Sequence, residues 1–160
     1  MDDAAVVARQ LGRSPRGRWR CVARCSHGFP TCIATEPLLD TGEPFPALYY
    51  LTCPHLVART SALESQGESQ RWREAVAADP SLASRLRDAD VSYRGARAAE
   101  GGGVDPTPGV GIAGQRDPLA VKCLHAHVAA YLAGIDDPIG AAVVRQVSAE
   151  CADRRCEEAV

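Results

Sequence analysis

Hydrophobic and polar positions repeat with two different periods along the chain, and the change of period divides the chain into elements. In residues 2–11 apolar side chains recur at helical spacing, whereas in residues 19–25 they alternate one by one, which is typical of a half-buried strand. Residues 31–35 and 47–52 are rich in apolar and aromatic side chains and predict two further strands. The N-terminal third therefore predicts one short helix and a small cluster of strands.

Helical signals dominate the rest of the chain. Cys53-Pro54 and the Asp-Pro pairs at residues 117–118 and 137–138 place proline at the first helical position, where its missing N–H costs nothing. A further pair, Asp79-Pro80, separates two helical stretches. An aspartate before that proline also supplies a capping oxygen. The predicted helices cover residues 54–66, 68–78, 81–98, 118–134 and 138–157.

These elements fit a single domain over residues 1–160. A strand cluster followed by a run of helices predicts an α+β fold, with a small antiparallel sheet from the N-terminal third packed against four to five helices. The Gly- and Pro-rich stretch between the helices predicts an exposed, mobile loop. The expected segments are a helix and basic turn (1–17), the strand cluster (18–53), helices (54–98), the flexible Gly/Pro loop (99–117) and C-terminal helices (118–158).

Cysteine and histidine residues are clustered along the sequence. The chain has seven cysteines and four histidines, and three of the histidines stand two residues after a cysteine. Thiolate and imidazole are the donors that zinc and iron–sulfur centres use. Three of these cysteines come from a strand end, a strand–helix junction and a helix, where side chains can project toward a common point. The predicted metal ligands are Cys25, Cys53, Cys123 and His127, and the expected cofactor is zinc or an iron–sulfur cluster.

The fourth ligand depends on where the helix around Cys123 begins. If that helix begins at Pro118, Cys123 and His127 lie about 40° apart on its surface, whereas His125 lies about 160° from Cys123. A regular helix therefore favours His127. A helix that begins after Cys123 makes His125 the competent ligand instead.

Other interpretations of the same residues remain open. Free cysteines often pack in the core as small hydrophobic side chains, and we interpret Cys151 and Cys156 as structural or incidental. A cysteine-dependent enzyme is a further hypothesis, in which Cys53 at a helix N-terminus is the nucleophile and His55 its base. A metal-free interaction module is another, in which an Arg-rich N-terminus contacts a protein or nucleic-acid partner. That segment contains Arg9, Arg13, Arg16, Arg18, Arg20 and Arg24, and a solvated basic face is its simplest interpretation.

Net charge and hydropathy give no global sign of nucleic-acid or membrane binding. The formal net charge is −2, so no excess of positive charge attracts phosphates. No apolar run approaches the ~20 residues of a membrane span. The first residues lack the basic start and apolar core of a secretory signal. We therefore expect a cytoplasmic protein whose thiols are reduced.

Several short motifs resemble those of the DUF501 family, a group of uncharacterised, mainly actinobacterial proteins. They include Arg24-Cys25, the stretch from Pro44-Phe45-Pro46 to Cys53-Pro54, and Lys122-Cys123-Leu124-His125. The resemblance extends from about residue 9 to about residue 140. It implies no activity. Among the candidate ligands it singles out Cys25, Cys53, Cys123 and His125.

Overall fold

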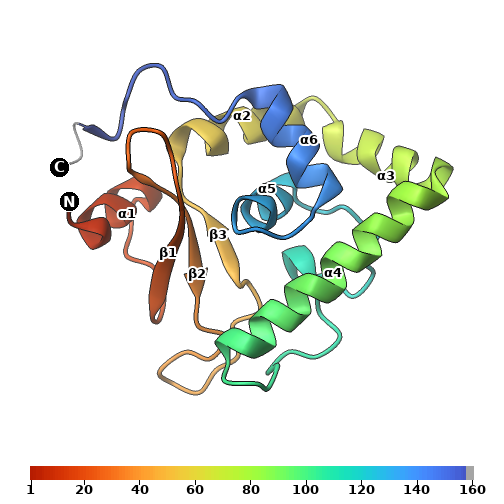
Figure 1. Ribbon diagram of the computed structural model, residues 1–160, viewed down its shortest axis with the longest axis horizontal. Coiled ribbons are helices and arrows are strands. Elements are labelled where there is room, and N and C mark those ends of the chain that lie inside the picture. The colour runs from red at the N-terminus through yellow and green to blue at the C-terminus, as the bar shows by residue number, and fades with distance from the viewer. Residues whose placement is uncertain (158–160) are drawn as a thin grey trace.

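A three-stranded sheet and six α-helices make up the part of the chain that the structure, a computed structural model, describes, residues 1–157 (Figure 1). The predicted α+β class and the antiparallel sheet are confirmed. Residue 158, the last residue of the predicted helical C-terminus, lies outside the described residues. The elements in chain order are α1 (Asp3–Leu11), β1 (Trp19–Arg24), β2 (Pro30–Thr35), β3 (Tyr49–Leu51), α2 (Pro54–Ser65), α3 (Glu68–Ala78), α4 (Pro80–Glu100), the 3-10 helix η1 (Ile112–Gly114), α5 (Leu124–Leu132) and α6 (Pro138–Val147).

Strand β2 lies in the middle of the sheet, between β1 and β3, and every one of its residues is buried. Successive side chains of a strand point to opposite faces. Cys32 faces helix α5 and its Sγ donates to the Ala129 carbonyl at 3.5 Å, whereas Ile33 lies in a hollow with Leu11 at the end of α1. Helices α1 and α5 therefore cover opposite faces of the sheet, as Figure 1 shows.

Helix α5 lies at the centre of the molecule (Figure 1). It contacts β2, β3, α2, α6 and η1. Leu124, Val128 and Ala129 are fully buried in the main core. Side chains at these spacings cover more than one face of a helix. A helix that is apolar on most sides belongs inside a domain rather than on its surface.

Aspartate side chains cap the N-termini of three helices. Asp2, Asp79 and Asp137 each accept hydrogen bonds from two backbone N–H groups in the first turn of α1, α4 and α6. In the latter two helices the next residue is the proline that suits the first helical position. These local signals explain why the predicted starts of the two helices agree with the structure within a residue or two.

Helix α5 begins at Leu124, six residues later than the Asp117-Pro118 pair predicts. The Asp117 carboxylate accepts only the Leu119 N–H, which closes a turn. Tertiary hydrogen bonds hold the next backbone groups outside a helix, because Arg73 donates to the Val121 carbonyl at 2.9 Å and the Leu124 N–H donates to Glu64 at 2.7 Å. The prediction of a helix from residue 118 is therefore corrected.

Helix α6 ends at Val147 rather than near residue 157. Ser148 adopts a positive φ of 63°, a conformation that ends a helix. The segment beyond it is attached by two histidines. His55 Nε2 lies 3.0 Å from the Ser148 carbonyl, and His27 Nε2 lies 3.2 Å from the Cys151 carbonyl. These side chains satisfy carbonyl groups that a longer helix would have satisfied itself.

The Gly/Pro loop after α4 is attached to the domain by a buried arginine. Arg97 has an exposed fraction of 0% and forms a two-point ion pair with Asp105 at 2.8 Å. It also donates to the carbonyls of Pro46 and Thr107 at 3.1 Å, and to that of Val110. Residues 101–104 are exposed as expected, whereas Gly111, Ile112 and Gln115 in the later part of the loop are buried.

Helices α5 and α6 approach each other most closely at Gly140. A Cβ atom there would lie 2.1 Å from the His127 carbonyl oxygen and 2.7 Å from the Tyr131 Cβ. One neighbour is a backbone atom of α5 and the other is a Cβ that the α5 backbone fixes, so neither can move without separating the helices. Gly140→Ala should lower the free energy of unfolding by about 1–3 kcal/mol, the usual range for overpacking, as measured by urea denaturation.

Gly95 in α4 provides the matched control, because nothing lies within 4 Å of a Cβ added there. Gly95→Ala should raise stability by about 0.5–1 kcal/mol, since alanine favours a helix interior more than glycine does. Equal effects of the two substitutions would contradict the close packing of α5 on α6.

Candidate functional site

The four residues predicted as one metal site lie in three places. Cys25 and Cys53 line the same small pocket at one end of the sheet. Cys123 precedes the first turn of α5, whereas His127 lies in the interior of that helix. Within residues 1–157, the ligand atoms of these four residues do not gather within 4.8 Å of one another.

His127 forms a buried pair with Asp137. Its Nδ1 lies 2.6 Å from Asp137 Oδ2, and both side chains are at most 1% exposed. The other carboxylate oxygen, Oδ1, accepts the N–H groups of Ile139 and Gly140 at the start of α6. The pair therefore joins α5 to α6, and the histidine has a structural contact of its own.

A different group of potential ligands converges at the start of α5. Glu64, Cys123 and His125 each bring one ligand atom within 4.8 Å of the others. His125 Nδ1 lies 3.2 Å from Glu64 Oε2 and 4.0 Å from Cys123 Sγ. The late start of α5 explains the meeting, because Cys123 has extended backbone dihedral angles and its side chain does not follow the helical rotation. This is the condition under which the sequence favours His125.

Helix α2 supplies the surroundings of His125. Val57, Ser61 and Glu64 follow one another at spacings of four and three residues, so they share one face of α2. His125 Nε2 lies 3.2 Å from the Val57 carbonyl and 3.1 Å from Ser61 Oγ. Glu64 was missed by the sequence analysis. The sequence does place Glu64 on the same face of α2 as Val57 and Ser61. That placement indicates a role for Glu64 only once α2 is known to pack beside α5.

Hydrogen bonds orient each member of the group. Glu64 Oε1 accepts the Leu124 N–H at 2.7 Å, which leaves Oε2 directed at the histidine. With a proton on Nε2, His125 donates to the Val57 carbonyl, and the Nδ1 lone pair then faces Glu64 and Cys123. A histidine whose second ring nitrogen is held by a carbonyl is the usual arrangement around bound metal ions.

Electrostatic coupling within the group shifts two pKa values in opposite directions. The hydrogen bond with Cys123 raises the pKa of His125 to about 9, against the effect of burial, and Glu64 adds to the rise. Burial of the Cys123 thiol opposes its ionisation, but the hydrogen bonds from His125 and from the Ala126 backbone outweigh burial and lower the thiol pKa. The group therefore stabilises a negatively charged sulfur beside a positive charge.

Cys123 and His125 line an open groove of about 470 Å³. The groove follows the outer edge of β3, since Tyr49, Tyr50 and Leu51 form part of its wall. Most of its lining is apolar. A small molecule in this groove would therefore have direct access to the thiol and the imidazole.

The residues of this group lie within the part of the chain that matches a known protein family. The family model described as "Protein of unknown function (DUF501)" matches residues 21–145, which is most of the chain and includes Glu64, Cys123 and His125. The chain belongs to the DUF501 family. No curated protein and no solved structure matches it.

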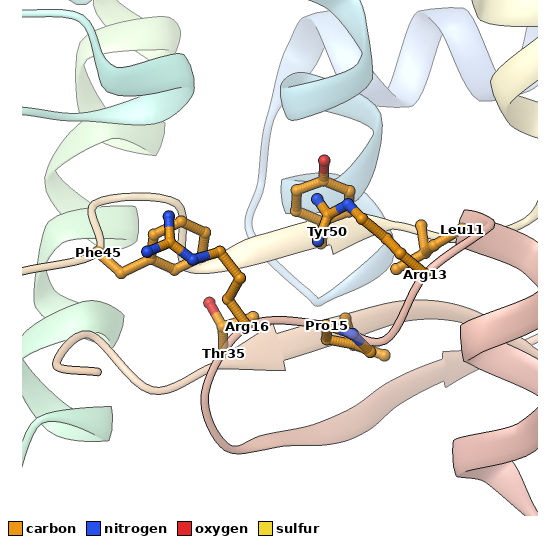
Figure 2. A pocket seen from close by; sticks show the side chains of 8 residues that line it. Leu11, Arg13, Pro15, Arg16, Thr35, Phe45 and Tyr50 are labelled. Atoms are coloured by element: carbon orange, nitrogen blue, oxygen red, sulfur yellow. The ribbon is translucent and has the colours of Figure 1, made fainter. Parts of the chain in front are cut away.

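The basic N-terminal segment of this DUF501 protein is largely paired with carboxylates. Three of its arginines form ion pairs at 2.6–3.0 Å, and Arg16 lies 3.5 Å from Glu43. Figure 2 shows Arg13 and Arg16 at a shallow hollow that also contains Phe45 and Tyr50, and Tyr50 belongs to the groove as well. The three close pairs are Arg18–Glu36, Arg20–Glu100 and Arg24–Asp3.

Cys53 and His55, the residues of the cysteine-enzyme hypothesis, do not form an activated pair in the DUF501 protein. Burial raises the pKa of the Cys53 thiol. His55 Nε2 is directed at the Ser148 carbonyl at 3.0 Å.

Among residues 1–157, no helix combines the length and the apolar character that a membrane span requires.

The coupling within the group predicts how His125 titrates when metal is stripped from the protein. Its imidazole signal, followed by NMR, should titrate near pH 9 rather than at the ordinary value of 6.5. Because the folded pKa is raised, the stability that protonated His125 contributes is fully present below about pH 6.5 and is lost as the pH rises through about 9.

Cys123→Ser is the informative variant for this titration, since the thiol is the largest cause of the shift. The substitution should move the His125 titration down toward 6.5. A wild-type His125 that titrates at its ordinary value would show that the thiol and the imidazole do not interact.

Proposed function

We propose that this DUF501 protein binds a divalent transition-metal ion of the zinc class through Glu64, Cys123 and His125. The observation that supports the proposal most directly is the convergence of three different donor atoms within 4.8 Å. Thiolate, imidazole and carboxylate are the three side-chain donors that zinc uses in proteins. They are contributed here by two helices that are packed against each other.

The spacing of the donor atoms suits such an ion. Zinc–ligand bonds of about 2.0–2.3 Å at tetrahedral angles place neighbouring donors about 3.3–3.6 Å apart. The nitrogen–oxygen distance of 3.2 Å and the sulfur–nitrogen distance of 4.0 Å lie on either side of that range. All three donor atoms lie within 4.8 Å of one another, so a modest movement of the side chains would close the site.

The arrangement around His125 favours a cation over a catalytic triad. In a triad, the nucleophile and the acid contact opposite nitrogens of the imidazole ring. Here Cys123 and Glu64 both face Nδ1, and Nε2 is directed at the Val57 carbonyl. In the metal-free protein a proton on Nδ1 supplies the positive charge between these two groups, in line with the raised pKa of His125. A divalent ion in the place of that proton would bring two positive charges to the same point.

Three protein ligands beside a groove leave one coordination position for a small ligand. Structural zinc sites are closed by four protein ligands, whereas sites with chemical roles keep an open position. Cys123 and His125 line the groove, so a water or an added ligand can complete the shell from that side. A single thiolate does not suit an iron–sulfur cluster, which usually takes four. Zinc is therefore the cofactor that this group favours.

The test is metal content after purification without oxygen and dialysis against a weak chelator. Cys123→Ser and Glu64→Gln should each remove about one equivalent of zinc relative to wild type, because each removes a ligand or its charge. Glutamine keeps the shape of Glu64 and its bond from the Leu124 N–H, so the second variant should remain folded.

Cys21→Ser is the matched control for this test. Cys21 is half-buried, and its Sγ donates to the Ala23 carbonyl outside the group. The zinc content of the Cys21→Ser protein should equal that of wild type. Unchanged zinc content in both Cys123→Ser and Glu64→Gln would overturn the proposal. Rapid alkylation of Cys123 in wild-type protein supplied with excess zinc would overturn it as well.

A further inference from the structure

Four of the seven cysteines line one pocket, which has no lining residue in common with the groove beside Cys123. Cys25 follows β1, and Cys53 precedes α2. Cys151 and Cys156 come from the segment after α6. The sequence analysis placed the first two in a metal site and interpreted the last two as structural or incidental. Folding instead brings all four to a common wall, here called the thiol pocket.

The thiol pocket has the size of a single small occupant. Its volume is about 10 Å³, close to the least space that holds one water molecule. Cys53, Cys151 and Cys156 are buried, and Cys25 is half-buried. Charge on Cys25 or Cys156 raises the pKa of Cys53 in addition to the effect of burial, as expected for neighbouring sulfurs. The pocket is therefore too small for an organic ligand but large enough for an ion.

A second observation indicates that something polar belongs in the pocket. Thr31 lines it and is 4% exposed, and its Oγ1 has no hydrogen-bond partner. A buried hydroxyl without a hydrogen-bond partner destabilises the folded protein. A thiolate bound to a metal ion in the pocket would accept a hydrogen bond from it.

The charged groups around the pocket suit several thiolates. Arg154 and Arg155 both line it. Each also contacts a carboxylate, Glu157 at 3.1 Å and Asp153 at 2.5 Å respectively. His27 lines the pocket too and holds the Cys151 carbonyl. Thiolates are soft ligands that prefer zinc and copper(I) to magnesium or calcium.

We propose that the thiol pocket is a second metal site, in which Cys25, Cys53 and Cys156 bind a zinc-class ion and Cys151 completes the shell. The site shares no ligand with Glu64, Cys123 and His125, so it does not depend on the proposed function. Thiols lose their protons to solvent as the metal–sulfur bonds form, and no oxidation state changes.

The sulfurs must come closer together than they lie here, because no three of them fall within 4.8 Å of one another. The C-terminal segment supplies this movement. His27 holds the Cys151 carbonyl, and the segment has no helix between Val147 and the last described turn. The Sγ atoms of its two cysteines form hydrogen bonds that metal binding would replace. These are Cys151 Sγ to Asp153 at 2.7 Å and Gln10 Nε2 to Cys156 Sγ at 3.4 Å. Metal binding would thus attach this segment to the sheet.

The experiment uses reduced full-length Cys123→Ser protein, in which the first site lacks its thiolate, titrated with cobalt(II). One equivalent should bind with the intense sulfur-to-cobalt charge-transfer absorption that several thiolates give, and zinc should displace it. Cys53→Ser and Cys156→Ser in the same background should weaken binding at least about tenfold. Cys21→Ser is the control and should leave both absorption and affinity unchanged.

A second measurement covers the case in which a variant fails to fold. Zinc added to the Cys123→Ser protein should protect the four pocket thiols from iodoacetamide, as read by peptide mass spectrometry, and leave Cys21 unprotected. Equal alkylation with and without zinc would overturn the second site. Formation of a disulfide within the pocket in preference to zinc uptake would assign it to redox chemistry instead.

Discussion

The close packing of helix α5 against its neighbours is the constraint on which the rest of the structure depends. Gly140 lets the backbone of α6 approach the His127 carbonyl, and the buried His127–Asp137 pair fixes how the two helices are aligned. On the other side, Cys32 of β2 donates to the Ala129 carbonyl. Because α5 is held along its length, its first residue has a defined place, and that place determines where Cys123 and His125 lie.

The start of α5 therefore links the fold to the chemistry. Glu64 caps the Leu124 N–H with one oxygen and faces His125 with the other. One carboxylate thus ends the irregular segment before the helix and takes part in the candidate metal site. In a helix that continued back through Cys123, the thiol would lie about 160° around the helix from His125. Glu64 therefore contributes both to the start of α5 and to the geometry of the candidate ligands.

The sequence predicts the elements whose signals are local and misses those that tertiary contacts decide. Asp79 and Asp137 with their prolines mark helix starts that need no other part of the chain. The Asp117-Pro118 pair has the same signal, but contacts from Arg73 and Glu64 override it. Likewise, Cys151 and Cys156 reach the thiol pocket because α6 ends early, where His55 binds the Ser148 carbonyl. Periodicity alone contains no information about such partners.

The buried guanidinium of Arg97 has a consequence for how the domain responds to acid. Ile112 buries the later part of the loop in the core, whereas the glycine-rich part nearer α4 has little apolar surface and is attached by the polar contacts of Arg97. Arginine stays charged at every ordinary pH, and the Arg97 hydrogen bond lowers the pKa of Asp105 below its usual value of 3.8. The attachment weakens only in strong acid, as the pH falls through that lowered pKa. The Arg97–Asp105 ion pair thus remains intact over the pH range in which His125 changes charge. Ionisation of His125 beside the groove therefore leaves the attachment of the Gly/Pro loop after α4 unchanged.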